Sequence, residues 1–177
     1  MMASAICEDI PLAGSFRSSA SFGKRQEFGA IAELLRRGYD VYLTLVDDQG
    51  IDCIVRQDAD TYFDVQIKAR SREVNPRNAG FFPTLPIPEL RDNYIFILYA
   101  EAAEHPNGGS QGVYWVIPSK EIAEHGGSLK SGPGKGAFRL WLTLHSQKTG
   151  LVTVRPKYRK FIDAFEEAFG TPPAKRK

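Results

Sequence analysis

The amino-acid sequence predicts an α/β fold in which helices flank a central mixed β-sheet. Residues 62–70 alternate apolar and polar side chains with a period of two, which is typical of a strand with one buried face. Residues 93–100 are apolar nearly throughout, as in a central strand that is covered on both faces. Apolar residues follow helical spacing in 21–37 and again in 157–169. A helix, a run of strands and a closing helix are therefore expected in that order.

The chain has 177 residues, of which 42% are hydrophobic and 25% charged, and this composition is typical of a globular domain with a core of its own. We expect a flexible lead-in over residues 1–19, a single domain over 20–170 and a basic tail over 171–177. The sequence contains no internal repeat, so nothing in it indicates a second domain.

Charge and cysteine content exclude several classes of protein. The net charge is only +2, so a nucleic-acid surface would have to come from clustered basic residues. Two cysteines, Cys7 and Cys53, are too few for a disulfide framework and lack the spacing of a zinc site. The sequence has neither a membrane-spanning apolar run nor a signal peptide at its start, so we expect a cytoplasmic protein without a membrane partner.

The first predicted helix runs from Ser21, a suitable N-cap, to Arg37, and Gly38 suits its C-cap. Glu27 lies four residues before Ile31, on the apolar stripe, so its carboxylate is expected to point towards the sheet. The alternative is a partly exposed glutamate near the helix start, stabilised by the helix dipole.

Three strands are predicted next, at residues 39–46, 51–55 and 62–70, joined by turns at 47–50 and 58–60. Consecutive strands with short turns form an antiparallel meander. The polar side chain of Asp52 then lies beside those of Gln66 and Lys68. Taken singly, each is explained as an ordinary strand residue, with Lys68 paired to Asp64.

Residues 71–88 contain four prolines and are predicted to be a loop, because proline cannot donate to a helix or a strand ladder. Arg70, Arg72 and Arg77 are placed to contact phosphates there, although Phe81 and Phe82 equally favour a loop packed against the domain.

The second half of the chain is predicted to add supporting elements. The histidines are isolated in the sequence, so none is expected to bind metal or to act in catalysis. Residues 132–136 lack the spacing of a phosphate loop, so no nucleotide cofactor is expected. The predicted elements are strands at 93–100, 113–117 and 138–144, a short helix at 119–125 capped by Ser119, and the closing helix at 157–169.

The polar residues of the meander resemble the PD-(D/E)xK nuclease superfamily. Gly50-Ile51-Asp52 is similar to its Gly-x-Asp strand, and Gln66-Ile67-Lys68 to the Gln-x-Lys branch of its Glu-x-Lys strand. The stretch from Gly23 to Ala30, with Glu27, and then Leu34 and Gly38 resemble the helix that precedes this hairpin and carries an extra glutamate. The resemblance covers about the first half of the chain, and it departs where Gln66 replaces the more frequent carboxylate.

The resemblance implies a restriction-endonuclease-like α/β/α sandwich, similar to Holliday-junction resolvases or to restriction and homing endonucleases. It implies a magnesium-dependent DNA endonuclease, with Mn²⁺ as a substitute, acting in repair, restriction or a mobile element. Asp52, Gln66 and Glu27 would be its metal ligands and catalytic residues, together with Lys68. The resemblance also implies a homodimer or a partner subunit as its assembly. The clustered basic residues expected to contact DNA are Lys24, Arg25, Arg70, Arg72 and Arg77.

Two alternatives stay open at this stage. The neutral amide of Gln66 favours a catalytically inactive nuclease-fold module that binds nucleic acid or a partner protein. The modest net charge favours a nuclease subunit whose DNA contacts come from a partner chain.

Overall fold

The computed structural model describes residues 19–173, apart from 47–48, 88–89, 109–110 and 131–134. The predicted lead-in, apart from Ser19, and the lysines and arginine of the predicted tail lie outside this part. Within it, no helix is long and apolar enough to cross a membrane.

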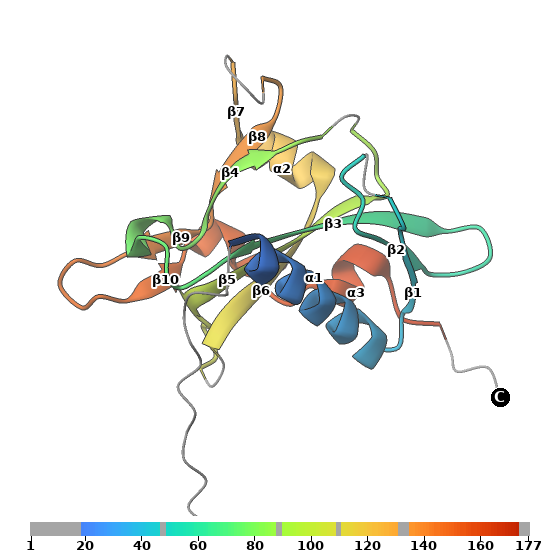
Figure 1. Ribbon diagram of the computed structural model, residues 1–177, viewed down its shortest axis with the longest axis horizontal. Coiled ribbons are helices and arrows are strands. Elements are labelled where there is room, and N and C mark those ends of the chain that lie inside the picture. Colours follow the sequence, from blue (N-terminus) through green and yellow to red (C-terminus); the bar gives the residue numbers. More distant parts are fainter. Residues whose placement is uncertain (1–18, 47–48, 88–89, 109–110, 131–134, 174–177) are drawn as a thin grey trace, which may run out of the picture.

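A mixed sheet forms the centre of the molecule, as predicted (Figure 1). Strands β1, β2 and β3 pair antiparallel in the predicted meander, and β3 then pairs parallel with the long strand β5. On β5, strand β6 pairs antiparallel, and β10 pairs parallel near the end of β5 and carries β9. Among the described residues the seven strands are β1 (Asp40–Leu43), β2 (Cys53–Arg56), β3 (Tyr62–Arg70), β5 (Tyr94–Glu104), β6 (Gln111–Pro118), β9 (Thr143–His145) and β10 (Val152–Val154).

Both faces of this sheet are covered, which completes the predicted sandwich. One face packs against α1 (Ser19–Arg36) and α3 (Phe165–Phe169). The other carries a second, smaller sheet, the short helix α2 and the 3₁₀ turn η3 (Figure 1). The elements on that side are η2 (Pro76–Asn78), β4 (Phe81–Leu85), α2 (Ser119–His125), β7 (Gly127–Ser128), β8 (Phe138–Trp141) and η3 (Pro156–Phe161).

The first helix ends as predicted. Gly38 has φ +93°, a left-handed conformation that glycine adopts without strain, and its N–H donates to the carbonyl of Leu35 at 3.0 Å. The chain then turns directly into β1, which ends at Leu43 instead of the predicted Val46.

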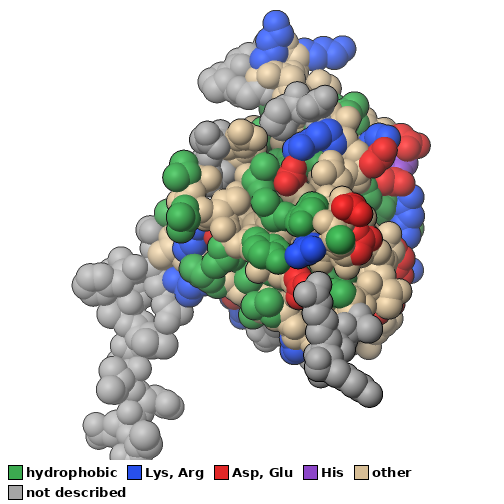
Figure 2. Space-filling view, turned by 90° about the vertical axis from the view of Figure 1, so that its right-hand side faces the viewer, with side chains coloured by type: hydrophobic (Ala, Val, Ile, Leu, Met, Phe, Trp, Pro, Cys, Tyr) green, Lys and Arg blue, Asp and Glu red, His purple; other side chains and the backbone are tan. Residues whose placement is uncertain are grey.

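Strand β1 is the outer edge of the main sheet. Tyr42 and Leu43 of this strand, and Leu45 and Val46 after it, are exposed. Figure 2 views the molecule from this side and shows hydrophobic side chains exposed among charged ones.

The predicted loop at 71–88 is wrong, because it contains η2 and strand β4. Strand β4 pairs with β8, and the register shifts between Phe82 and Leu85. Pro83 lies within this irregularity, where a strand tolerates the missing N–H. The predicted strand at 138–144 is in fact two, since β8 ends at Trp141 and β9 begins at Thr143 in the other sheet.

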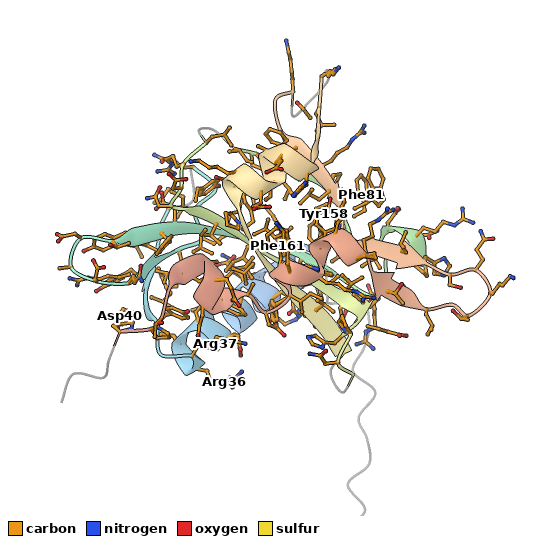
Figure 3. All side chains as sticks on the ribbon, turned by 180° about the vertical axis from the view of Figure 1, so that it is seen from behind. Arg36, Arg37, Asp40, Phe81, Tyr158 and Phe161 are labelled. Carbon is orange, nitrogen blue, oxygen red and sulfur yellow. The ribbon has the colours of Figure 1, made fainter. Side chains whose placement is uncertain are left out.

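The predicted closing helix at 157–169 is also wrong. It is divided into η3 and α3 by Asp163, whose φ is +50°. The connecting segment pairs with the free edge of β6, where the N–H of Asp163 donates to the carbonyl of Tyr114 at 3.1 Å. Phe161 therefore packs on one face of the main sheet and Phe165 on the other. Figure 3 shows Tyr158 and Phe161 of η3 on the side of the main sheet that carries Phe81.

Helix α2 has the predicted bounds but not the predicted cap. Pro118 occupies the N-cap position, and the buried hydroxyl of Ser119 donates to the carbonyl of Arg91 at 2.9 Å. Ser119 therefore joins α2 to the segment that enters β5.

Candidate functional site

Asp52 lies immediately before β2, at the point where β2 and β3 begin to pair. Its N–H donates to the carbonyl of Val65 at 2.9 Å, and its carboxylate Oδ2 accepts from the N–H of Ile67 at 2.6 Å. The carboxylate thus accepts the hydrogen bond of a β3 backbone N–H at a position where no β2 carbonyl is available to accept it. It is fixed at the residue between Gln66 and Lys68, as the predicted hairpin requires.

Gln66 departs from the expectation of a solvent-facing polar side chain, because it is 1% exposed. Its Oε1 is buried and has no hydrogen-bond partner among the described residues. A buried acceptor without a partner costs roughly 1–3 kcal/mol in an ordinary core. Such a cost is tolerated where the group has a role, and an unsatisfied amide oxygen is a suitable ligand for a hard cation.

The turn at Gly50 covers the amide of Gln66. Gly50 has φ +73°, and a Cβ at this position would lie 2.4 Å from Nε2 of Gln66. The hydroxyl of Tyr94 donates to the carbonyl of Gly50 at 3.2 Å and holds the turn in place. Only glycine permits this approach, which explains the glycine of the Gly-x-Asp motif in physical terms.

Lys68 follows Gln66 by two residues on the same face of β3, opposite Leu98 of β5. The side chain is half-buried, and none of the described residues forms a hydrogen bond or an ion pair with its ammonium group. The expected alternative partner, Asp64, instead pairs with Arg91 at 2.8 Å. The ammonium is therefore available for a ligand beside Asp52 and Gln66.

Glu27 lies in the middle of α1, well past the first turn, and its side chain is 16% exposed. Its carboxylate accepts from Nζ of Lys24 at 2.7 Å. Burial, and to a smaller extent the negative charges of Asp52 and Glu27, raise the pKa of the Cys53 thiol to about 12. The charge of Glu27 thus acts on a thiol that is buried between α1 and the sheet, as expected for a side chain on the sheet-facing side of that helix.

This raised pKa predicts a stability change at alkaline pH. The thiol has an ordinary pKa of 9.0 when the chain unfolds and about 12 when it is folded. Its contribution is fully present below pH 9 and is lost as the pH rises towards 12, because the unfolded state then binds fewer protons. Relative to Cys53→Ala, the wild-type free energy of unfolding should fall with a limiting slope of about 1.4 kcal/mol per pH unit. Urea unfolding of both proteins across this range measures the two slopes, and equal slopes would contradict the raised pKa of the buried thiol.

Two of the predicted DNA-contacting residues lie on α1. Lys24 is engaged by Glu27. Arg25 is exposed, donates to the Ser21 hydroxyl at 3.4 Å and lies 5.9 Å from the ring of Phe22. Lys24 therefore lies beside Glu27, and Arg25 is exposed one residue further along the helix.

The other three lie where β3 leaves the sheet. Arg70 is half-buried, its Nε donates to the carbonyl of Phe81 at 2.6 Å, and burial lowers its pKa. Arg72 pairs with Glu101 at 3.3 Å, and Arg77 is exposed in η2. Arg70 therefore anchors β3 to the small sheet, and Arg77 is more accessible to a ligand than Arg70.

One group of potential ligands was not predicted. Donor atoms of Glu121, Glu124 and His125 on α2 lie within 4.8 Å of one another. Lys160 already pairs with Glu121 at 3.0 Å, which offsets part of the negative charge. The spacing of these residues along one helix turn is the signal that would have found them.

Comparison with known proteins supports the fold. No protein-family model and no curated protein matches the sequence. Among solved structures, the chain is similar to that of a bacterial homing endonuclease, I-Ssp6803I, with a TM-score of 0.52 and 13% identity. The match covers 88% of this chain and 94% of the other. Identity at this level shows a common fold, an α/β sandwich around a mixed sheet.

Proposed function

We propose that the chain is a metal-dependent DNA endonuclease of the PD-(D/E)xK type. The observation that carries the proposal is the buried Oε1 of Gln66, which has no partner in the described part of the chain and lies beside the fixed carboxylate of Asp52. An inactive core would be expected to satisfy or replace such a group.

The donor atoms fit a magnesium ion. Asp52, Gln66 and Glu27 offer oxygen atoms only, and Mg²⁺ prefers such ligands and retains several waters. Mn²⁺ accepts the same ligands. When bound, the ion would neutralise charge that develops on the phosphate and lower the pKa of an attached water.

The protein groups have separate roles in this proposal. Asp52 and Gln66 would hold the ion at the edge of β3, and Glu27 would complete the site from α1. Lys68 would orient the attacking water or stabilise negative charge on the phosphate in the transition state. Gln66 and Lys68 are separated by roughly 7 Å along the strand, so one phosphate can lie between the ion and the ammonium group.

Two observations favour DNA as the substrate. The structure of similar fold is that of a homing endonuclease. Arg25 on α1 and Arg77 in η2 supply exposed positive charge. Contacts of this kind position a phosphate backbone without reading its sequence.

A second candidate function is an inactive nuclease-fold module that binds nucleic acid or a partner protein. It is favoured by the neutral amide of Gln66 and by the ion pair that occupies Glu27 at 2.7 Å. The two functions differ in how the site should respond to an added carboxylate.

Gln66→Glu separates them. In a functional site the new carboxylate should tighten Mg²⁺ binding to the free protein and keep or raise cleavage, because it adds charge to the ligand set. In an inactive module it should add only an uncompensated buried charge next to Asp52, with destabilisation and no cleavage.

Calorimetric titration of Mg²⁺, with and without a non-cleavable duplex, measures this difference. For the wild type we expect weak binding alone and tighter binding with the duplex, since the phosphate adds an oxygen ligand. Gln66→Asn, which keeps an amide but shortens its reach, is the matched control. Absence of metal binding in all titrations would exclude the proposed mechanism.

A further inference from the structure

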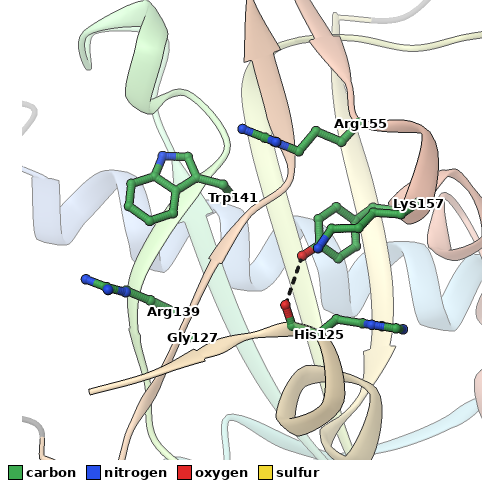
Figure 4. A pocket seen from close by; sticks show the side chains of 7 residues that line it. His125, Gly127, Arg139, Trp141, Arg155 and Lys157 are labelled. Atoms are coloured by element: carbon green, nitrogen blue, oxygen red, sulfur yellow. Dashed lines mark hydrogen bonds between the residues drawn. The ribbon is translucent and has the colours of Figure 1, made fainter. Parts of the chain in front are cut away.

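A pocket of about 330 Å³ lies between the small sheet and η3 (Figure 4). Its volume is in the range of small-molecule sites. It takes one wall from β8 and the other from η3 and the residue before it. The lining residues are His125, Gly127, Arg139, Trp141, Arg155, Lys157 and Tyr158.

The pocket is strongly positive. Arg139, Arg155 and Lys157 carry charge, and no acidic residue is among those that line it within the described chain. Neither Arg139 nor Lys157 forms an ion pair with any described residue; Arg139 lies 5.9 Å from the ring centroid of Trp141, and Lys157 lies 4.6 Å from that of Tyr158. Nε of Arg155 donates to the carbonyl of Thr143 at 3.1 Å, which fixes its guanidinium group. Three such cations around one opening favour a bound phosphate.

His125 contributes its backbone more than its ring. Its carbonyl accepts from the hydroxyl of Tyr158 at 3.5 Å, which ties α2 to η3 behind the pocket. The imidazole points away from Arg139 and Trp141 (Figure 4) and lies 3.3 Å from the carboxylate of Glu121. The positive charge of the pocket therefore does not depend on protonation of His125.

Trp141 forms the aromatic wall. It is 39% exposed, so part of its ring is accessible to a ligand. Phe81 stacks on it with the ring centroids 3.8 Å apart and 14° between the planes. Since Phe81 does not line the pocket, it supports the indole from the other side. A rigid, exposed indole beside three cations is a suitable surface for a nucleobase.

We propose that this pocket binds one unpaired nucleotide of a DNA strand. Its base would stack on Trp141, and Arg139, Arg155 and Lys157 would hold its phosphate. An internal base of a duplex has both faces covered by its neighbours, so stacking on protein requires an unpaired base or a strand end. DNA as the ligand rests on the proposed function.

Direct contacts connect the pocket to the strand that carries Lys68. Arg70, two residues further along β3, donates to the carbonyl of Phe81, and Phe81 stacks on Trp141. A DNA strand held in the pocket would thus take a fixed position relative to β3, because the side chains between the pocket and β3 are already packed. The pocket would select substrates with an unpaired segment near the cleaved bond.

The test measures binding of a fluorescent twelve-nucleotide oligo-dT, and of a duplex of equal length, by anisotropy in the presence of EDTA. Trp141→Ala should weaken binding of the single strand by about tenfold, and Trp141→Phe should restore most of it. Arg139→Gln with Lys157→Gln should reduce the slope of log affinity against log salt by about 1.4. The matched control replaces Lys148 and Arg159, two exposed cations outside the pocket, and should leave affinity for the labelled strand nearly unchanged and reduce that slope less.

Three other outcomes would overturn the proposal. Single-strand affinity that is unchanged in Trp141→Ala would exclude stacking there. If thymidine monophosphate displaces the labelled oligonucleotide as well as an unlabelled strand does, the ligand is a free nucleotide. Loss of duplex binding equal to that of the single strand would indicate a general phosphate contact. This binding test involves neither metal nor cleavage. A protein that binds single strands through Trp141 but does not cleave DNA would therefore refute the proposed endonuclease function and still support the proposed pocket.

Discussion

Replacement of Lys68 by alanine should lower DNA cleavage by at least two orders of magnitude while the protein stays folded. The ammonium group has no ion pair among the described residues, so its removal leaves no buried partner charge. One lost contact to transition-state charge is worth roughly 3 kcal/mol, which corresponds to about a hundredfold in rate. Single-turnover cleavage of a plasmid with saturating Mg²⁺ measures the effect, and most of the affinity for DNA should persist.

Lys148→Ala is the control for this variant, because it removes an exposed lysine from the turn between β9 and β10. Its cleavage rate should equal that of the wild type. A Lys68→Ala protein that cleaves at more than a third of the wild-type rate would contradict the assigned role.

Replacement of Asp52 by asparagine should lower cleavage to a similar extent and raise the Mg²⁺ concentration needed for half-maximal activity. Asparagine can still accept from the N–H of Ile67, so the hairpin should keep its geometry. What is lost is the negative charge that would hold the ion. Cleavage rates across a Mg²⁺ titration give both quantities.

Asp60→Asn removes an equal charge from the exposed turn between β2 and β3 and should not change either quantity. Asp52→Asn also has an internal structural check. It removes one of the charges that raise the pKa of Cys53, so the loss of unfolding free energy at alkaline pH should end at a lower pH than in the wild type. Unchanged cleavage together with this shift in pH dependence would show that Asp52 is in place but has no catalytic role.

The hairpin that carries Asp52, Gln66 and Lys68 could be predicted from the sequence because its geometry is local. The period of two gave the bounds of Tyr62–Arg70 correctly, and apolar residues fixed the hairpin register that pairs Cys53 with Val65. Continued by one residue, that register places Asp52 beside Gln66, and the Asp52 carboxylate reaches the N–H of Ile67. The apolar stripe of α1 likewise predicted which side of that helix packs on the sheet.

The burial of Gln66 could not be predicted in this way. The face of β3 that carries it is covered by a core built from β4, β8 and η3, which are distant in the sequence. The prediction of one closing helix was wrong for a related reason. Phe161 and Phe165 have helical spacing but belong to different hydrophobic cores. Apolar spacing shows that residues are buried, but it does not show that one surface buries them all.

The pocket on the small sheet could not be found from the sequence either. Arg139 and Trp141 lie on β8, whereas Arg155 and Lys157 flank the start of η3. Only the pairing of β4 with β8 brings Phe81 under the indole. The sequence contains the basic and aromatic residues, but their convergence depends on tertiary contacts.

A crystal structure with Mn²⁺ and a non-cleavable DNA duplex tests the central claim most directly. The anomalous signal of manganese should identify an ion bound by Asp52 and by Oε1 of Gln66, with Lys68 facing the same phosphate. An ion bound only at Glu121, Glu124 and His125, or no ion beside Gln66 when DNA is present, would contradict the proposed active site.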